Sequence, residues 1–330
     1  KQGVFMKTIA LAGVGGLVGD KTLQLLQANL AGRVNLRLFG RSEAGKRVQF
    51  GGKWVTVEPL DRLIDGDIDY ALFTATEEIS AKYVPPLAQC GTVCIDNSAV
   101  FRLSDGVPLV VPSVNGRQAK GNIIANPNCV TIPVAMVVNA LMDLAPTKVS
   151  AVTYQAASGG GKEGLADLVL RRKNGRTKCF ETQIFDNVLP LCGKMTDDGR
   201  TTEEHKLTNE LPKILGMPGL AANCFCVRVP VTVGHSVVLN VTFDRSVTTD
   251  EVKERLAKAT DVLLFAQNVP TPLTVRNTKY VAAGRVVQET DNCVTMFVTS
   301  DNLLRGAAYN AYEILRLVLD GANENKDNQP

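Results

Sequence analysis

The sequence predicts an α/β protein with two domains, and three observations support this fold class. The chain has 330 residues, whereas a single domain usually holds roughly 100–200 residues. In residues 8–96, short apolar runs alternate with amphipathic segments, as in a doubly wound parallel sheet. From about residue 149 the chain is rich in β-forming runs with few helices between them, which indicates an α+β domain with a mixed sheet and helices on one face.

The composition excludes several classes of protein. Hydrophobic residues make up 45% of the chain and charged residues 21%, and the net charge is +3. This balance argues against a nucleic-acid or membrane partner, and no apolar run reaches the ~18–20 residues of a membrane span. The first six residues lack a signal-peptide pattern. The eight cysteines form no zinc-like pairs, so we expect no metal site, reduced thiols and a cytoplasmic location.

The first half of the chain contains four apolar runs that predict buried parallel strands. These runs are residues 8–12, 34–39, 70–74 and 92–96. After the first run, Leu23, Leu26 and Leu30 fall on one face of an expected helix. Together these elements predict a Rossmann-type sheet.

The second half contains β-rich runs and fewer helices. The expected strands are residues 149–154, 226–231, 236–243 and 294–298. The expected helices are residues 132–141, 246–259 and a final amphipathic helix at 301–319. Domain boundaries are therefore expected at residues 128/129 and 301/302, with residues 1–128 and 302–330 in the first domain and residues 129–301 in the second.

A glycine-rich turn follows the first strand. Gly13, Gly16 and Gly19 allow the backbone to approach a pyrophosphate, and the helix N-terminus behind them supplies donors and positive potential. The candidate cofactor ligands in this turn are Gly13, Gly15, Gly16, Leu17, Val18 and Gly19. The alternative is a tight strand-to-helix turn that binds nothing.

The end of the second strand indicates which nicotinamide cofactor binds. An NAD site usually has an acidic residue ~20 positions after the glycines, where it bonds to the ribose 2′-hydroxyl. Here Arg41 and Ser42 stand at that position, and they suit a 2′-phosphate, although Glu43 follows directly. The sequence therefore favours NADP, and the alternative for Arg41 is an ordinary surface residue.

Cys129 is the candidate nucleophile because of its position. It lies three residues before the start of the expected helix at residues 132–141, and a helix N-terminus favours thiolate over thiol. The alternative for any cysteine is a small buried hydrophobic residue, and we assign the other seven to that class.

The chain has two histidines that could exchange protons with a thiol. His205 lies in a charged stretch typical of a solvated helix start. His235 follows a glycine and precedes a strand, which predicts a tight turn where an imidazole can point into a cleft. His235 is therefore the candidate base.

Several segments, in order along nearly the whole chain, resemble aspartate-β-semialdehyde dehydrogenase of the bacterial type. They are Asn126-Pro127-Asn128-Cys129, residues 96–102 ending in Arg102, residues 111–115, residues 158–164, Arg228 seven positions before His235, and residues 301–308. The resemblance implies NADPH-dependent reduction of L-aspartyl-4-phosphate to aspartate semialdehyde and phosphate, a step toward lysine, methionine and threonine. It also implies a homodimer, with a tetramer as the alternative.

The resemblance implies a role for each matching residue. Cys129 would form a thioester, His235 would act as acid and base, and Gln155 would orient the substrate. The substrate-binding set would be Arg228 for the α-carboxylate, Glu203 for the amino group, and Arg102, Lys206 and Asn128 for phosphate. Further cofactor contacts would come from Ser158, Gly159, Gly160 and Asn302.

The charges of these residues suit such a substrate, which carries a carboxylate, an ammonium and a phosphate. Arg228, Arg102 and Lys206 supply cations and Glu203 supplies an anion. The alternative for each of them alone is a solvated surface charge.

The chain departs from the family pattern at three places. Ser113 replaces a glutamate, and Val130 replaces the hydroxyl-bearing residue that usually follows the nucleophile. Glu77 and Glu78 stand where the family has a small-residue loop near the cofactor, and we expect their charges to repel a pyrophosphate.

Two other functions fit the same segments. The first is a related acyl-phosphate or acyl-CoA reductase, such as an N-acetyl-glutamyl-phosphate reductase or a malonyl-CoA reductase. The second is a paralogue with little or no catalytic activity that serves as a binding protein. The presence of Cys129, Gln155, Arg228 and His235 argues against the second.

Overall fold

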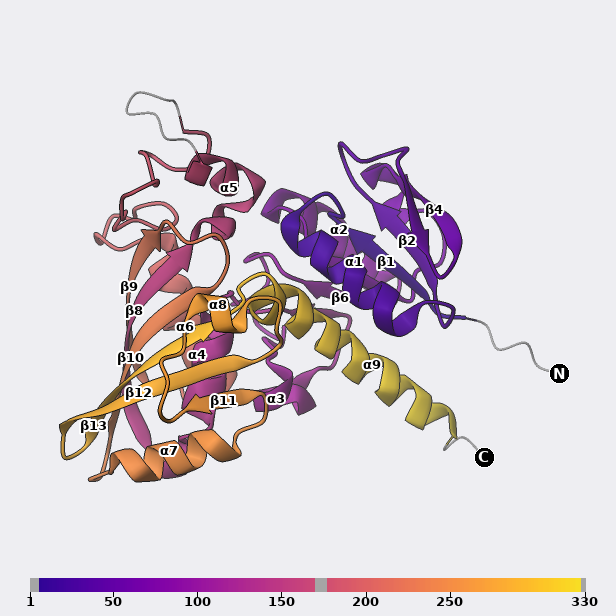
Figure 1. Cartoon of the computed structure of the whole chain (residues 1–330). Helices are drawn as coiled ribbons and strands as arrows, with labels where there is room; N and C mark the ends of the chain where they lie inside the picture. Colours follow the sequence, from indigo (N-terminus) through magenta and orange to yellow (C-terminus); the bar gives the residue numbers. More distant parts are fainter. Residues whose placement is uncertain (1–5, 170–176, 328–330) are drawn as a thin grey trace. The chain divides into compact units, whose positions relative to one another are not determined.

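The computed structural model describes residues 6–169 and 177–327. The chain forms two compact units, which divide between Pro127 and Asn128 and again between Gly306 and Ala307 (Figure 1). These divisions lie one and five residues from the expected boundaries. Gly306 belongs to the second unit because it packs closely on Cys129: a Cβ on Gly306 would lie 2.8 Å from the Cys129 carbonyl oxygen.

The first unit contains a seven-stranded sheet in the order β3-β4-β2-β1-β5-β6-β7. Its strands are β1 (Thr8–Ala12), β2 (Asn35–Phe39), β3 (Arg47–Phe50), β4 (Lys53–Glu58), β5 (Tyr70–Phe73), β6 (Val93–Asp96) and β7 (Ile123–Ala125). Neighbouring strands are parallel, except that β3 and β4 are antiparallel. The order from β4 to β7 is that of a doubly wound dinucleotide-binding sheet, with the reversal of direction beside β1.

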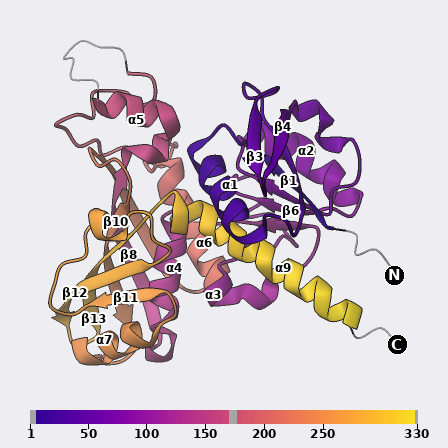
Figure 2. The same ribbon diagram turned by 45° about the vertical axis from the view of Figure 1, so that its right-hand side comes forward.

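The helices of the first unit are α1 (Leu17–Leu30), α2 (Glu77–Gln89), α3 (Pro112–Asn115) and the C-terminal α9 (Tyr309–Asp327). Leu26 and Leu30 of α1 are buried against the sheet. Ile314 and Leu315 of α9 belong to the same hydrophobic core, and both ribbon views show α9 beside α1 (Figure 2). The last helix therefore completes the first unit, although it follows the second unit in sequence.

The second unit contains a six-stranded mixed sheet in the order β11-β12-β13-β10-β8-β9. Its strands are β8 (Pro146–Ala156), β9 (Ala221–Val229), β10 (His235–Phe243), β11 (Val262–Phe265), β12 (Val281–Thr290) and β13 (Cys293–Ser300). Its helices are α4 (Thr131–Asn139), α5 (Gly161–Val169), α6 (Thr202–Leu215), α7 (Thr249–Lys258) and α8 (Pro272–Val275). The β8–β9 and β11–β12 pairs are parallel and the other pairs antiparallel, which confirms the expected fold class.

The two faces of this second sheet differ. Helices α4 and α6 pack on one face, where alternate residues such as Val149 and Leu239 are fully buried. The intervening residues point to the opposite face of the sheet. On that face Val152, Tyr154 and Phe225 of β8 and β9 are exposed. The sheet therefore carries an apolar surface that its own helices do not cover.

The termini of two helices differ from the expected bounds for identifiable reasons. Helix α7 begins at Thr249 because Thr248 and Glu251 form a reciprocal capping box. The last helix begins at Tyr309 and not at residue 301, because a π-helical turn, Leu304–Ala308, precedes it. The Asp301 carboxylate accepts hydrogen bonds from the backbone at that turn. Neither hydrophobic periodicity nor helix propensity predicts these starting residues of the two helices.

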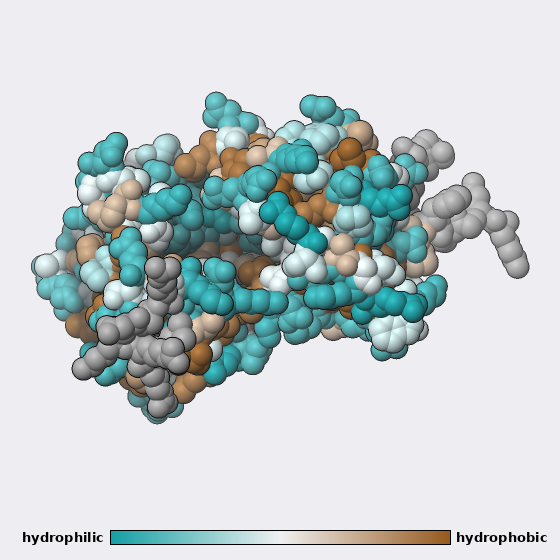
Figure 3. Space-filling model, turned by 90° about the horizontal axis from the view of Figure 1, so that it is seen from above, coloured by the Kyte–Doolittle hydropathy of each residue, from teal (hydrophilic) through white to brown (hydrophobic). Residues whose placement is uncertain are grey.

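The view in Figure 3 shows one face on which hydrophilic side chains predominate, with smaller apolar areas between them. No helix in the part of the chain that the structure describes combines the length and apolar character needed to cross a membrane.

Candidate active site

The glycine-rich turn between β1 and α1 has the backbone geometry of a pyrophosphate site. Gly13 has a φ of +91°, and a Cβ on it would lie 2.6 Å from the Thr74 carbonyl oxygen. A Cβ on Gly19 would collide with the Gly13 carbonyl oxygen, so that glycine allows α1 to pack on the strand. Gly16 is the N-cap of α1, where the first N–H groups have no partner within the helix. This turn therefore offers donors and positive potential to an anion.

The remaining residues of the turn lie beside these donors. Leu17 and Val18 are the first two residues of α1. A Cβ on Gly15 would collide with the carboxylate of Glu43, so that carboxylate packs against the turn. The structure thus brings Glu43 to a place where it can contact a bound nucleotide.

The residues expected to discriminate between NADP and NAD lie just after the end of β2. Arg41 is exposed and its guanidinium lies 3.6 Å from the carboxylate of Glu78. Ser42 donates a hydrogen bond to Glu43 at 2.8 Å. Glu77 and Glu78 occupy the first turn of α2, where negative charge stabilises a helix N-terminus. Glu78 therefore competes with a 2′-phosphate for Arg41.

Cys129 lies at the N-terminus of α4. The Asn128 carbonyl oxygen accepts a hydrogen bond from the Ile132 N–H at 3.0 Å. The side-chain oxygen of Asn128 accepts two more, from Val130 N–H at 2.9 Å and from Thr131 N–H at 3.4 Å. Asn128 therefore caps the turn that leads into α4, and the partly exposed Cys129 lies in that turn, two residues before the helix begins at Thr131. This position favours the thiolate.

Helix α6 positions Asn128 through two carboxylates. The backbone N–H of Asn128 donates to Glu210 at 2.7 Å, and its side-chain amide donates to Glu203 at 2.8 Å. Glu203 and Glu210 are seven residues apart in sequence, so both lie on one face of the helix. A capping box between Thr201 and Glu204 fixes where this helix begins. Glu210 was not predicted from the sequence, because its partner Asn128 lies 82 residues away along the chain.

Glu203 is also paired with Lys206, whose ammonium lies 3.1 Å from the carboxylate. Burial would raise the pKa of Glu203, but Lys206, the Asn128 amide and Arg228 outweigh burial and lower that pKa to about 2. Glu203 is therefore an anion at neutral pH and can accept hydrogen bonds from an ammonium group.

Gln155 and Arg228 lie side by side on neighbouring strands, β8 and β9. Gln155 is 1% exposed, and its amide nitrogen is 3.5 Å from a Glu203 oxygen. Arg228 is buried and donates from Nη1 to the Ala156 carbonyl oxygen at 2.9 Å. Its Nε has no partner among the described residues. An unsatisfied guanidinium edge of this kind suits a carboxylate ligand.

Arg228, Glu203 and Lys206 line a cavity of about 610 Å³ within the second unit. Gly159, Gly160, Cys179, Phe180, Leu189 and Cys192 also line it. A Cβ on Gly159 would lie 2.5 Å from Arg228 Nη1. Any larger residue at this position would therefore displace the guanidinium. The structure thus places Gly159 and Gly160, expected at the cofactor, beside the candidate substrate residues.

A loop after α5 forms one wall of this cavity. The Phe180 ring lies 5.6 Å from the Arg228 guanidinium carbon. The buried carboxylate of Asp167 accepts backbone hydrogen bonds from Lys178, Cys179 and Phe180. Burial would raise the pKa of Asp167, but these three N–H groups lower it. The sequence does not predict this loop, because no local pattern links Asp167 to residues eleven or more positions later.

His235 is the first residue of β10 and is 1% exposed. Gly234 before it has a φ of +106°, which turns the chain tightly into the strand. The Nδ1 atom of His235 accepts a hydrogen bond from the Ala156 backbone N–H at 3.0 Å. Burial, and secondarily the positive charge of Arg228, lower the pKa of His235 to about 3. The imidazole is therefore neutral at physiological pH.

Ser158 and Asn302, expected to contact cofactor, are both buried and hydrogen-bonded to each other at 3.0 Å. The side-chain oxygen of Asn302 also accepts from the Gly234 N–H at 2.9 Å. Asn302 therefore holds the turn that presents His235.

Arg102 lies in the first unit and is buried there. It donates to the carbonyl oxygens of Asn126 at 2.9 Å and Asn97 at 2.7 Å. The other substrate candidates, Asn128, Glu203, Lys206 and Arg228, belong to the second unit.

The residues that depart from the family pattern lie on helices or in the buried core. Ser113 is an exposed residue of α3. Val130 is buried beside the nucleophile, so an apolar side chain fills that place. Glu77 and Glu78 are the start of α2.

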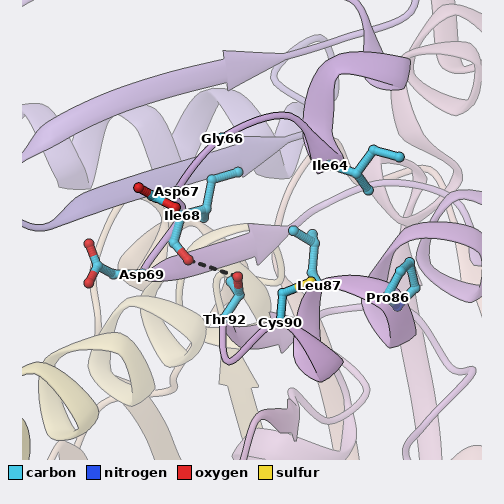
Figure 4. A pocket seen from close by; sticks show the side chains of 9 residues that line it. All are labelled: Ile64, Gly66, Asp67, Ile68, Asp69, Pro86, Leu87, Cys90 and Thr92. Carbon is cyan, nitrogen blue, oxygen red and sulfur yellow. Dashed lines mark hydrogen bonds between the residues drawn. The ribbon is translucent and has the colours of Figure 1, made fainter.

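A second cavity, of about 520 Å³, lies in the first unit (Figure 4). Ile64, Asp67, Asp69, Leu87, Cys90 and Thr92 are among its lining residues. These residues precede β5 and β6 in sequence, so the cavity lies at the amino ends of those strands. Doubly wound sheets bind their ligands at the carboxyl ends, and none of the expected site residues lines this cavity.

Comparisons with known proteins agree with this arrangement. The semialdehyde dehydrogenase NAD-binding domain family matches residues 8–122, and the semialdehyde dehydrogenase dimerisation domain family matches residues 138–305. The aspartate-semialdehyde dehydrogenase of Rickettsia bellii is 36% identical over 324 residues, which cover 93% of this chain and 96% of that protein. The Corynebacterium glutamicum enzyme of the same name is 36% identical over 346 residues, covering 95% of this chain and 100% of that protein.

Solved structures show the same likeness. The crystal structure of aspartate semialdehyde dehydrogenase II from Vibrio cholerae superposes with a TM-score of 0.90 at 32% identity, covering 96% of this chain and 99% of that one. A structure of that enzyme complexed with ASA gives the same TM-score. With these relatives, a dinucleotide-binding turn and a cysteine at a helix N-terminus, the chain belongs to the aspartate-semialdehyde dehydrogenase family of oxidoreductases.

Proposed function

We propose that this protein catalyses the NADPH-dependent reduction of L-aspartyl-4-phosphate to L-aspartate-4-semialdehyde and phosphate, and the reverse phosphorylating oxidation. The observation that carries the proposal is the cavity in which Arg228, Lys206 and Glu203 meet. Its two cations and one anion match an amino acid that bears a carboxylate, an ammonium and a phosphate. The product semialdehyde would enter the synthesis of lysine, methionine and threonine.

Cys129 is the nucleophile in this proposal. Its thiolate attacks the acyl carbon, the bond from that carbon to the phosphate oxygen breaks, and phosphate leaves with the bonding electrons. The resulting thioester accepts hydride, which the nicotinamide cofactor supplies when bound. The carbon–sulfur bond then breaks, which releases the aldehyde and regenerates the thiolate. Asn128, held by Glu203 and Glu210, fixes the direction from which Cys129 attacks.

In this proposal, charged and amide groups of the chain hold the substrate. Arg228 offers its Nε to the α-carboxylate, and the anionic Glu203 accepts from the amino group. Lys206, Arg102 and Asn128 are assigned to phosphate. Gln155, packed between Glu203 and Arg228, orients the reacting carbonyl group.

The cofactor is assigned to the glycine-rich turn of the first unit. Gly13, Gly15, Gly16, Leu17, Val18 and Gly19 would hold the pyrophosphate, and Arg41 with Ser42 would hold a 2′-phosphate. Ser158, Gly159, Gly160 and Asn302 remain proposed as further cofactor contacts. Residues 1–128 and 302–330 are thus proposed as the NADP-binding domain, and residues 129–301 as the catalytic and dimerisation domain.

Replacing Glu78 with glutamine is expected to lower the dissociation constant for NADP by about two- to fivefold, because an exposed ion pair no longer competes for Arg41. Fluorescence titration of the purified protein with NADP and with NAD measures the change. Glu77→Gln is the matched control, since it removes a neighbouring carboxylate that has no pair with Arg41 in the structure. Equal effects of both variants on NADP and NAD would contradict a 2′-phosphate site at Arg41.

The proposed assembly is a homodimer that covers the apolar face of the second sheet. Val152 and Phe225 are paired in register on β8 and β9, and Tyr154 lies two residues further along the same face. These three side chains are between 37% and 52% exposed in the single chain. A surface of this kind is typical of protein–protein contacts.

Phe225→Asp is expected to raise the dimer dissociation constant by about 100-fold or more, since it places a charge in an apolar contact. Analytical ultracentrifugation over a range of protein concentrations measures it. Leu273→Asp is the control, because Leu273 is 72% exposed but lies on α8 and not on the sheet. A dimer that persists unchanged in Phe225→Asp would exclude this face as the interface.

The activity itself is tested with aspartate semialdehyde, phosphate and NADP. The purified protein is expected to reduce NADP only when phosphate and the semialdehyde are both present, and Cys129→Ala is expected to have no measurable activity. Full activity in Cys129→Ala would exclude the mechanism. Activity only with N-acetyl-glutamyl semialdehyde or a CoA thioester would assign the protein to a related reductase, and no activity with any substrate would favour a binding paralogue.

The proposed location is the cytoplasm, because the mechanism needs a reduced Cys129. All eight cysteines lie among the described residues, and none of them forms a disulfide.

A further inference from the structure

We propose that Glu43 determines the cofactor specificity of this chain, and that it makes the chain bind NAD as well as NADP. Its carboxylate would accept a hydrogen bond from the ribose 2′-hydroxyl of NAD and would repel the 2′-phosphate of NADP. This role rests on the proposed function, whose cofactor is assigned to the glycine-rich turn of the first unit. It changes the preference for NADP that Arg41 and Ser42 led us to expect.

The carboxylate of Glu43 lies against the glycine-rich turn. A Cβ on Gly15 would collide with this carboxylate, and a Cβ on Gly40 would lie 3.2 Å from its Oε2. The Gly13 N–H donates to the Phe39 carbonyl oxygen at 3.0 Å, which joins the turn to the end of β2. In dinucleotide-binding sheets, the acidic side chain that bonds to the ribose follows the second strand, while the glycine-rich turn holds the pyrophosphate. Glu43 is the acidic side chain that this fold brings to that place.

The backbone after β2 fixes the position from which Glu43 extends. The Lys46 N–H donates to the Glu43 carbonyl oxygen at 3.0 Å, and Gly45 has a φ of +86°. A positive φ at the third position of a β-turn favours glycine. The Gly45 N–H also donates to the carbonyl oxygen of Val57 on β4 at 2.8 Å. Glu43 therefore extends from a turn that is anchored on the sheet, and it is half-buried.

The two groups expected to bind a 2′-phosphate both interact with carboxylates. The Ser42 hydroxyl has one proton, which it donates to Glu43 Oε1 at 2.8 Å. The side chain of Arg41 is 71% exposed, and its guanidinium lies 3.6 Å from the Glu78 carboxylate. Exposed ion pairs contribute little binding energy. A 2′-phosphate would therefore meet two carboxylates beside one solvated cation, whereas a 2′-hydroxyl would meet an acceptor.

NAD and NADP differ only at this ribose position, so one carboxylate acts on them in opposite directions. A hydroxyl that donates to a carboxylate forms a charge-assisted hydrogen bond, whereas a phosphate and a carboxylate repel each other. Arg41 attracts the 2′-phosphate and offsets part of this repulsion. We therefore expect dissociation constants for NAD and NADP that lie within about tenfold of each other, a difference of about 1.4 kcal/mol or less.

Isothermal titration calorimetry of the purified protein with NAD and with NADP, in the absence of substrate, tests the role of Glu43. Glu43→Gln is expected to lower the dissociation constant for NADP by about five- to 20-fold and to raise that for NAD by about two- to tenfold. Glu43→Asp keeps the charge and is the matched control, so its constant for NADP should stay within about threefold of the wild type. Glu78→Gln acts through Arg41, so it should change the constant for NADP and leave that for NAD unchanged.

A wild-type preference for NADP larger than tenfold would overturn the proposal, and so would a Glu43→Gln variant in which both constants move in the same direction or neither moves. Binding of neither dinucleotide would overturn both this role and the cofactor assignment. The expected shift in a protein that does not oxidise aspartate semialdehyde would refute the proposed function and leave the role of Glu43 intact. Semialdehyde oxidation with NADP alone, unchanged in Glu43→Gln, would support the proposed function and refute the role of Glu43.

Discussion

Replacing Arg228 with leucine is expected to reduce kcat/KM for aspartate semialdehyde by about 30- to 5,000-fold, the range expected when one partner of a buried, hydrogen-bonded charge pair is removed. Arg228 is buried, its Nη1 is engaged by the Ala156 carbonyl oxygen, and its Nε has no protein partner among the described residues. A substrate carboxylate is the group that this arrangement recognises. The loss should appear mainly in KM, because the carboxylate is bound equally in the ground and transition states.

A second substrate distinguishes the loss of carboxylate recognition in Arg228→Leu from damage to the fold. An aldehyde that lacks the α-carboxylate, such as 3-aminopropanal, should react slowly with the wild type and at a similar rate with Arg228→Leu. Arg228→Lys keeps the charge but loses the planar fork, so an intermediate loss is expected. If Arg228→Leu lowered the rates with both aldehydes by the same factor, Arg228 would be supporting the cavity and not reading the carboxylate.

Replacing Glu210 with leucine is expected to lower both stability and activity. Glu210 is 1% exposed and accepts the Asn128 N–H at 2.7 Å. Without an acceptor, that buried N–H costs about 1–3 kcal/mol of unfolding free energy, which a urea titration measures. Because Asn128 precedes Cys129, the proposed nucleophile, a displacement of about 1 Å there is expected to lower kcat by about 100-fold.

Glu210→Gln is the matched control for this second prediction. Its amide oxygen can still accept from Asn128, so kcat should recover to within about tenfold of the wild type, with KM little changed. Substituting Glu204, which is also buried on α6 but accepts from the Cys226 N–H and from the helix cap, should affect stability more than kcat. Wild-type kcat in Glu210→Leu would show that Glu210 does not position Cys129.

Local patterns were sufficient to predict the four buried parallel strands β1, β2, β5 and β6 of the first unit. The apolar run at residues 8–12 is β1, and the expected strands at residues 34–39, 70–74 and 92–96 correspond to β2, β5 and β6 within one residue at each end. Buried parallel strands are apolar on both faces, so they stand out from their surroundings. In contrast, β3, β4 and β7 were not predicted. Most residues of β3 and β4 are exposed or half-buried, and β7 has only three residues.

The residues of the candidate site also fall into two groups, those that local sequence patterns predict and those that they do not. Cys129 and His235 could be selected from sequence because a helix start and a glycine turn are local features. Glu210 and Asp167 could not, because their partners lie 82 residues away in one case and across a loop in the other. Burial, not residue type, distinguishes them from the many surface carboxylates of the chain.

By itself, the sequence determined the α/β class and the glycine-rich turn, and it singled out Cys129 as the candidate nucleophile, because each depends on residues adjacent along the chain. Only the tertiary structure decided how the charges meet. It paired Glu203 with Lys206 and Asn128, left Arg228 Nε without a protein partner among the described residues, and brought the Ala156 N–H to Nδ1 of the buried His235. The physical reason is that burial and long-range hydrogen bonds set ionisation and donor direction, and both arise only when distant segments pack together.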